Sequence, residues 1–460
     1  MAFPEEKTVP DNAVAVTLAV LTAVLLLALR PLTDVPMNDD FSWARSAEAF
    51  AQTGKIVYNG WGNPILLPHI LVGGVLIKLF GFSHVILGGF GVFSGALLAG
   101  ATYLLTRACR IPRALSLYVT GLAVLNPVFL GCAPTFMSDV PSAFLYTCAL
   151  LAFVRAAHIP DGEAQFRLRP APLITAVLFA YLAGANRQIL WASLFVAFAV
   201  GFRYLVPADR SRRLAPALLA LVLGAVALSA WFAAQPYSVT VSLEAVALFA
   251  RSAPDLLFWH PYKFLAFVGL AALPVTAPIA WATWNEQTRP APRFAACLAA
   301  GLVPFVFFLV PQSSSQEYWN GIWRLTAYGQ YATNQGVMVG GPAGYPLRPW
   351  MMPEFVGTLL NILGAVGIGM LVWCLLITNK KRTFPANVLL GGALAQIILP
   401  LPWFASGAIF DRYLLSLVPV LLIALLARHK VGDASLAADR QYTLKPFLLG
   451  APLAALFAFG

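Results

Sequence analysis

The sequence is poor in charged residues. Only 11% of its 460 residues are Asp, Glu, Lys or Arg, whereas a soluble globular domain carries about 25%. It contains 5 cysteines and 5 histidines, with no C-x-x-C spacing and no His cluster. The scarcity of charge excludes an ordinary soluble domain, and the cysteines argue neither for disulfides nor for a metal. We therefore expect no metal and no other cofactor.

Apolar residues dominate instead. The chain is 60% hydrophobic, its mean hydropathy is +0.77, and its apolar runs are long enough to cross a hydrocarbon core of about 30 Å. An all-α polytopic membrane protein is predicted, and its first apolar run is expected to be a retained helix. About 13 membrane spans are predicted, at 13–32, 84–106, 114–132, 140–157, 171–186, 188–206, 214–234, 262–284, 294–311, 355–378, 385–403, 411–427 and 446–460.

The basic residues are placed between these runs. A net charge of +11 could indicate nucleic-acid binding, but short basic clusters between spans are typical of cytoplasmic loops. We therefore expect contact with membrane lipids and none with nucleic acid. With the N-terminus inside, all six clusters fall on the cytoplasmic side, at 107–113, 167–169, 203–213, 289–293, 379–382 and 428–430.

The segment 63–82 decides this topology. It is apolar enough to be a span, yet a span here would move the later basic clusters outside. We therefore predict a re-entrant or amphipathic helix in the outer interface, broken by Pro64, Pro68 and the Gly73-Gly74 pair. Three outer regions of substance then remain, at 33–83, 235–261 and 312–354.

Two adjacent acids stand in the first outer region. Asp39 and Asp40 precede FSWARSAEAFAQTG, whose apolar residues repeat at helical spacing up to Gly54. Helix capping would explain one of them, for example Asp40, because Asp is a preferred N-cap residue. A second carboxylate at a bilayer surface is costly without a task. The pair therefore favours a functional site, with capping as the alternative for Asp40.

Other charges reach the same outer face. Asp139 opens the fourth span in an N-cap position, Arg187 stands in a short turn, and Arg412 opens the twelfth span. Lys263 lies close to His260 near the start of the eighth span. Each residue alone fits capping or snorkelling at the interface. Together they describe a site with carboxylates to accept a proton and cations to hold an anion.

Three stretches carry a resemblance to a known family. NDDFSWARSAEAFAQTG, NPVFLGCAPTFMSDVPSAF and FDRYLLSLVPVLLIALL resemble the acidic outer loops and a late span of the GT-C fold membrane glycosyltransferases. The resemblance points to the bacterial branch related to protein O-mannosyltransferases and lipid A aminoarabinose transferases. The resemblance covers the predicted spans well up to about residue 206 and is vague from there to about residue 400. We accordingly expect a family-like transmembrane module at 1–206, with its catalytic loop at 33–83, and a variable one at 207–460.

The resemblance implies a glycosyltransferase that is dependent on a polyprenyl-phosphate-sugar. A hexosyl or pentosyl group would pass, with inversion, to an acceptor hydroxyl on the extracytoplasmic face of a bacterial inner membrane. The acceptor is unknown and could be a glycan, a lipid or a protein. The implied catalytic residues are Asp39, four residues before Trp43, as the general base, and Asp40 at the second acidic position. The candidate substrate-binding residues are Trp43, Asp139, Arg187, His260, Lys263 and Arg412.

One departure and two alternatives accompany this hypothesis. The aminoarabinose branch has a Glu-Lys pair before the Pro that opens the interfacial helix, whereas Gly62 and Asn63 stand there in this chain. Phosphate binding must therefore differ from that branch. A transporter or flippase of lipid-linked sugars, or an enzyme like an O-antigen polymerase or ligase, would also be a multispan protein. The aromatic residues of 312–354 fit either sugar stacking or the aromatic belt at a membrane interface.

Overall fold

The structure is a computed structural model. It describes residues 9–29, 32–36, 39–62, 64–160, 165–239, 247, 256–284, 290–308, 332–333, 336–337, 354–377, 383–400 and 411–429. Helices dominate this part of the chain. They are α1 (Asp11–Leu29), α2 (Asp40–Thr53), α3 (Leu67–Phe80), α4 (His84–Ala108), α5 (Arg113–Val124), α6 (Pro127–Cys132), α7 (Asp139–Ala156), α8 (Pro170–Asn186), α9 (Ile189–Gly201), α10 (Pro207–Asp209), α11 (Ala215–Ala233), α13 (Leu256–Trp284), α14 (Pro290–Phe308), α16 (Glu354–Leu376), α17 (Phe384–Ile398) and α19 (Leu414–Arg428).

Strands are few and short in the described residues. β1 (Ala157–His158) pairs antiparallel with β2 (Arg167–Leu168), with Ala157 opposite Leu168. β3 (Ala332–Thr333) pairs antiparallel with β4 (Gly336–Val337), and β4 lies against α6. Six of the described helical segments are long and apolar enough to cross a membrane. The predicted all-α polytopic architecture is thereby confirmed, while the count of 13 spans stays a prediction.

Most predicted spans up to residue 427 coincide with helices to within a few residues, with two exceptions. The predicted span 114–132 is wrong, because α5 ends at Val124 and α6 begins at Pro127. The side chain of Asn126 accepts a hydrogen bond from the backbone N–H of Val128 at 2.9 Å and so caps α6. α13 begins at Leu256, six residues before the predicted start. The predicted span 446–460 lies outside the described residues.

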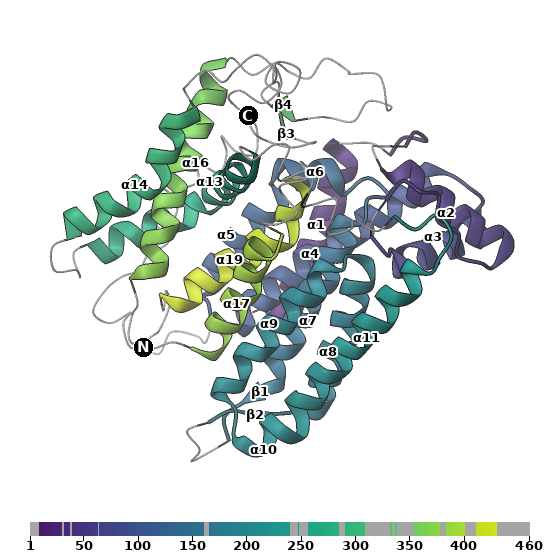
Figure 1. Cartoon of the computed structure of the whole chain (residues 1–460), viewed down its shortest axis with the longest axis horizontal. Coiled ribbons are helices and arrows are strands. Elements are labelled where there is room, and N and C mark those ends of the chain that lie inside the picture. Colours follow the sequence, from purple (N-terminus) through teal and green to yellow (C-terminus); the bar gives the residue numbers. More distant parts are fainter. Residues whose placement is uncertain are drawn as a thin grey trace, which may run out of the picture.

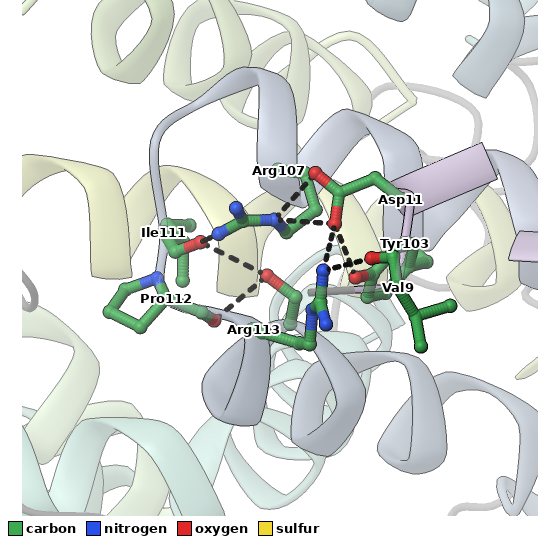
Figure 2. Close-up of polar contacts among 8 residues, drawn as sticks. Val9, Asp11, Tyr103, Arg107, Ile111, Pro112 and Arg113 are labelled. Carbon is green, nitrogen blue, oxygen red and sulfur yellow. Dashed lines mark hydrogen bonds and ion pairs between the residues drawn. The ribbon is translucent and has the colours of Figure 1, made fainter. Parts of the chain in front are cut away.

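The first and fourth helices run antiparallel and are tied together at both ends. At one end, the Asp11 carboxylate accepts hydrogen bonds from Nε of Arg107 at 3.1 Å, Nη2 of Arg113 at 3.3 Å and the Tyr103 hydroxyl at 2.8 Å (Figure 2). Both guanidinium groups point at the single carboxylate. Two arginines of the basic cluster at 107–113, Arg107 and Arg113, therefore lie at the start of α1.

The opposite end of this helix pair carries another carboxylate contact. Asp34 accepts hydrogen bonds from the Ser83 hydroxyl at 2.9 Å and from the backbone N–H of His84 at 2.6 Å. These contacts fasten the segment after α1 to the start of α4. They also place Asp34 on the same side as the outer acids.

Two of the predicted basic clusters, at 167–169 and 203–213, lie together at one end of the bundle, as the positive-inside pattern predicts. β1 follows α7 and pairs with β2, and Phe166 bridges to Leu205 beside α10. β1, β2 and α10 lie together at the bottom of Figure 1, and α2, α3 and α6 lie in its upper half. α7, at about 1.5 Å per residue, separates these two ends by roughly 27 Å.

α3 is a helix of 14 residues that packs mainly on α2. It is about 21 Å long at 1.5 Å per residue, shorter than a bilayer core, and the α2–α3 pair stands at one side of the bundle (Figure 1). The predicted break at the glycine pair is wrong, because α3 continues through it. A Cβ on Gly73 would meet Phe136 at 2.4 Å, and one on Gly74 would meet Phe50 at 2.4 Å. The glycines therefore serve close packing, and Pro68 lies in the first turn, where it does not interrupt the helix.

The late helices close the core against the early ones. α17 and α19 pack on α9 and α7, and buried polar contacts fix this packing. The Ser193 hydroxyl donates to the Gly392 carbonyl at 2.9 Å and lies 2.8 Å from the Tyr146 hydroxyl. This packing places the start of α19 beside the early helices. The division into modules 1–206 and 207–460 stays a prediction.

Candidate active site

Four charged residues from distant parts of the chain meet at the starts of four helices. Asp39 stands immediately before α2, Asp139 is the first residue of α7, and Arg187 lies in the turn between α8 and α9. Arg412 lies in the 3-10 turn Asp411–Tyr413 before α19. The sequence predicted that these residues share one face of the membrane, and the structure brings them into contact.

The Asp39 carboxylate is held at both oxygens. Its Oδ2 accepts a hydrogen bond from Nη2 of Arg412 at 2.7 Å, and its Oδ1 accepts one from the indole N–H of Trp61 at 3.0 Å. Its side chain is 17% exposed, whereas that of Arg412 is 5% exposed. Asp39 is therefore the partner in this ion pair that a substrate can reach.

Asp139 forms the deeper part of the cluster. Its Oδ2 lies 2.7 Å from Nη2 of Arg187, and its side chain is 2% exposed. Arg187 also donates from Nε to the Ser138 hydroxyl at 3.3 Å, and its guanidinium lies 5.3 Å from the ring centroid of Tyr413. Arg187 is thus fixed by an ion pair, a hydrogen bond and a cation–π contact.

Arg412 joins the two carboxylates. Besides its contact with Asp39, its Nε lies 3.7 Å from Oδ1 of Asp139. Charges removed from water to this extent are stable only when paired, because desolvation costs several kcal/mol per ion in practice. Arg412 is thus paired with Asp39 and Asp139, and Arg187 is paired with Asp139, so each arginine is already committed to a carboxylate.

The ends of the helices add to this electrostatics. A helix N-terminus carries about half a positive charge and favours nearby anions. Asp39 and Asp139 stand at the N-termini of α2 and α7, and the arginines stand before α9 and α19. The positive ends of α2 and α7 therefore attract the negative charge of these two side chains.

The structure clarifies the capping alternative. The cap position of α2 is Asp39, and its side chain makes no capping hydrogen bond, since it contacts Trp61 and Arg412 instead. Asp40 is the first helical residue and is 3% exposed, so the N-cap assignment for Asp40 is wrong. Asp139 likewise follows the cap residue, Ser138, and does not occupy the cap position.

Trp43 and His69 lie in the packing behind Asp39. Trp43 is 3% exposed, and its ring meets His69 edge-on, with centroids 6.0 Å apart. His69 is 1% exposed, stacks on Phe136 at 4.0 Å and donates from Nε2 to the Phe136 carbonyl at 2.9 Å. His69 thus ties α3 to the segment before Asp139. Sequence reasoning missed it because a lone His in an apolar run carries no spacing signal.

Two predicted site residues, His260 and Lys263, have side chains that the structure does not describe. Both residues belong to α13, and their roles stay predictions. Among the residues that the structure describes, no three His, Cys, Asp or Glu side chains gather as a metal site would require.

An apolar pocket adjoins the start of α19, and its lining includes Leu98, Thr102, Val124, Phe129, Leu414 and Val418.

Solved structures of known proteins share this fold. No protein-family model matches the sequence, and no curated protein matches it. The apo oligosaccharyltransferase of Archaeoglobus fulgidus matches at 17% identity with a TM-score of 0.52, over 97% of this chain and 54% of that chain. The chain thus spans about half the length of that protein. This match confirms the predicted GT-C type of fold.

ArnT from Cupriavidus metallidurans is also similar. Its apo structure matches at 17% identity with a TM-score of 0.38, over 97% of this chain and 76% of that chain. Its structure bound to undecaprenyl phosphate matches at 16% identity with a TM-score of 0.38, over 96% of this chain and 87% of that chain.

Proposed function

We propose that this protein is a glycosyltransferase that moves a sugar from a polyprenyl-phosphate donor to an acceptor hydroxyl. The observation that carries the proposal is the Asp39 carboxylate, accessible yet held at both oxygens by Arg412 and Trp61. The fold, shared with an oligosaccharyltransferase, and the motif resemblance support the same reaction class. The reaction takes place on the extracytoplasmic face of a bacterial inner membrane, the side opposite the basic clusters.

Asp39 is the general base in this proposal. As the acceptor oxygen attacks the anomeric carbon, its proton passes to the carboxylate of Asp39. The bond between the anomeric carbon and the phosphate oxygen breaks on the opposite side, and the polyprenyl phosphate leaves with the bonding electron pair. The configuration at the anomeric carbon is therefore inverted. Positioned proton transfer of this kind contributes about 10²–10⁴-fold to a rate.

The two arginines are not assigned as direct ligands of the donor phosphate. In the structure, Arg412 is paired with Asp39 and Asp139, and Arg187 is paired with Asp139. We assign Arg412 to orienting the base and Arg187 to fixing Asp139 beneath it. Their positive charge, with that of the helix N-termini, still favours the developing phosphate charge next to the site. Lys263 is the remaining candidate for direct contact with the phosphate.

The position of the charges distinguishes this proposal from transport. Substrate sites of secondary transporters lie near the bilayer midplane, on broken helices. Here Asp39, Asp139, Arg187 and Arg412 all lie at helix starts on one face. A catalytic site at the membrane surface accounts for this position better than a transport path.

Substitution of Asp39 by Asn tests the proposal. The purified protein would be incubated with candidate polyprenyl-phosphate sugars and acceptors, and products would be identified by mass spectrometry. The Asp39→Asn variant is expected to lose transfer by at least about 10²-fold while retaining donor binding, because the amide can still accept a hydrogen bond from Trp61 or Arg412.

The matched control is Glu48→Gln, which also removes one negative charge and lies on α2, the helix that follows Asp39. Glu48 pairs with Arg45, which is 67% exposed, at the protein surface. Glu48→Gln is expected to transfer sugar at the wild-type rate. Turnover of donor by Asp39→Asn at the wild-type rate would contradict the assigned base, and donor movement across the bilayer without a new glycosidic bond would favour a flippase.

A further inference from the structure

Trp61 is an exposed aromatic residue whose polar atom is engaged. Its side chain is 59% exposed, and its indole N–H donates to Oδ1 of Asp39 at 3.0 Å. An exposed indole at a membrane interface ordinarily directs its N–H to water or lipid headgroups. Here the N–H points to the carboxylate that we assign as the base.

The loop that carries Trp61 is built to hold it in place. The backbone N–H of Trp61 donates to Oδ1 of Asn59 at 3.3 Å. Asn59 in turn accepts from the Ser42 hydroxyl at 2.8 Å and donates to the Ser42 carbonyl at 2.9 Å. Gly60, with φ of 79°, supplies the left-handed turn between them. These bonds fix Trp61 to α2, the helix that directly follows Asp39.

Two more contacts limit the movement of this loop and ring. The Trp61 ring packs edge-on against Phe41, with centroids 5.3 Å apart and planes at 62°. Tyr58, three residues earlier, is buried and donates from its hydroxyl to the Ile65 carbonyl at 2.6 Å. The loop between α2 and α3 is therefore anchored on both sides of Trp61.

We infer that Trp61 is a positioning residue for Asp39. Arg412 and Trp61 bind different oxygens of the carboxylate, so together they fix its rotation about the last side-chain bond. A base held in one orientation presents the same lone pairs to each acceptor hydroxyl, and such preorganisation acts on the rate of the chemical step. This inference rests on the proposed function of Asp39 as the base.

Trp61→Phe tests the inference, because Phe keeps an aromatic ring against Phe41 and removes the N–H donor. A hydrogen bond to a charged group is lost, so kcat is expected to fall about 10- to 100-fold with little change in KM for the donor. Loss of this bond also favours the protonated carboxyl, so the acid limb of the rate profile is expected to move to higher pH. A purely structural role for Trp61 would not lower kcat at constant KM and would not shift the acid limb of the rate profile.

Trp281→Phe is the matched control, since Trp281 on α13 is 80% exposed, and it is expected to keep the wild-type kcat and pH profile. A wild-type kcat in Trp61→Phe would overturn the inference, as would a rise in KM alone. The two proposals fail separately. If Asp39→Asn loses transfer while Trp61→Phe does not, only the positioning role of Trp61 is wrong. Full activity of Asp39→Asn would show that Asp39 is not the base.

Discussion

Arg412 and Asp39, which are 373 residues apart in the sequence, are joined by a contact of 2.7 Å between Nη2 and Oδ2. The contact links the start of α19 to the start of α2. It sets the position of the accessible carboxylate from the opposite end of the chain. Because Arg412 also lies 3.7 Å from Asp139, one guanidinium group contacts both Asp39 and Asp139.

Replacement of Arg412 by Lys is expected to reduce transfer by about 10- to 100-fold, because an ammonium group cannot replace the planar fork that addresses two carboxylates. Arg412→Gln is expected to lower the free energy of unfolding by about 3–5 kcal/mol as well, since it removes the arginine that is paired with the largely buried carboxylate of Asp39. Turnover and thermal unfolding in detergent would measure both effects. Arg45→Lys, at an exposed position, is the control, and a fully active Arg412→Lys protein would argue against the orienting role.

The pair formed by Asp139 and Arg187 is expected to show strong coupling. Both side chains are largely buried, at 2% and 12% exposure, so either single substitution, Asp139→Asn or Arg187→Gln, leaves a buried charge without its 2.7 Å ion-pair partner. The double variant should be more stable than the sum of the single losses predicts, by about 0.5–3 kcal/mol. A double-mutant cycle on unfolding measures this coupling, and strictly additive losses would show that the pair contributes no mutual stabilisation.

Close packing of α3 on α2 is expected to depend on Gly74. A Cβ there would lie 2.4 Å from Phe50 and 3.0 Å from the Ala47 carbonyl oxygen. Gly74→Ala is therefore expected to destabilise the protein by about 1–3 kcal/mol through overpacking. Gly121 on α5 offers the control, because a Cβ there meets nothing within 4 Å. Gly121→Ala should be neutral or stabilising by up to about 1 kcal/mol, and equal effects of the two changes would refute the packing role.

Acid pH is expected to loosen the outer junction of α1 and α4. Hydrogen bonds from the Ser83 hydroxyl and the His84 backbone N–H hold the pKa of Asp34 below its ordinary value of 3.8. Because the folded state favours the charged form, this stabilisation is present above pH 3.8 and is lost as the pH falls through the lowered pKa. The melting temperature of Asp34→Asn should therefore vary less between pH 5 and pH 2 than that of the wild type. Identical pH dependence in the two proteins would exclude this contribution.

Much of the architecture could be predicted because it depends on local composition. Apolar runs of sufficient length must be helices in a bilayer, and most of the predicted spans up to residue 427 coincide with helices. The prediction of one continuous span at 114–132 is also wrong for a local reason, because Asn126 caps a new helix and Pro127 begins it. The predicted helix break at the glycine pair of α3 is wrong because the helix continues there through its packing on α2, which the local sequence does not reveal.

The sequence by itself determined the membrane class, the common face of the outer acids and cations, and the candidacy of Asp39, since hydropathy and charge placement follow from the order of residues alone. Only the tertiary structure decided which of these charges touch. It paired Arg412 with Asp39 and Arg187 with Asp139, buried Trp43 and brought Trp61 to the carboxylate. The reason is physical: an ion pair across 373 residues forms through the packing of α19 and α17 on the early helices, and helical periodicity carries no information about which distant helix will be the neighbour.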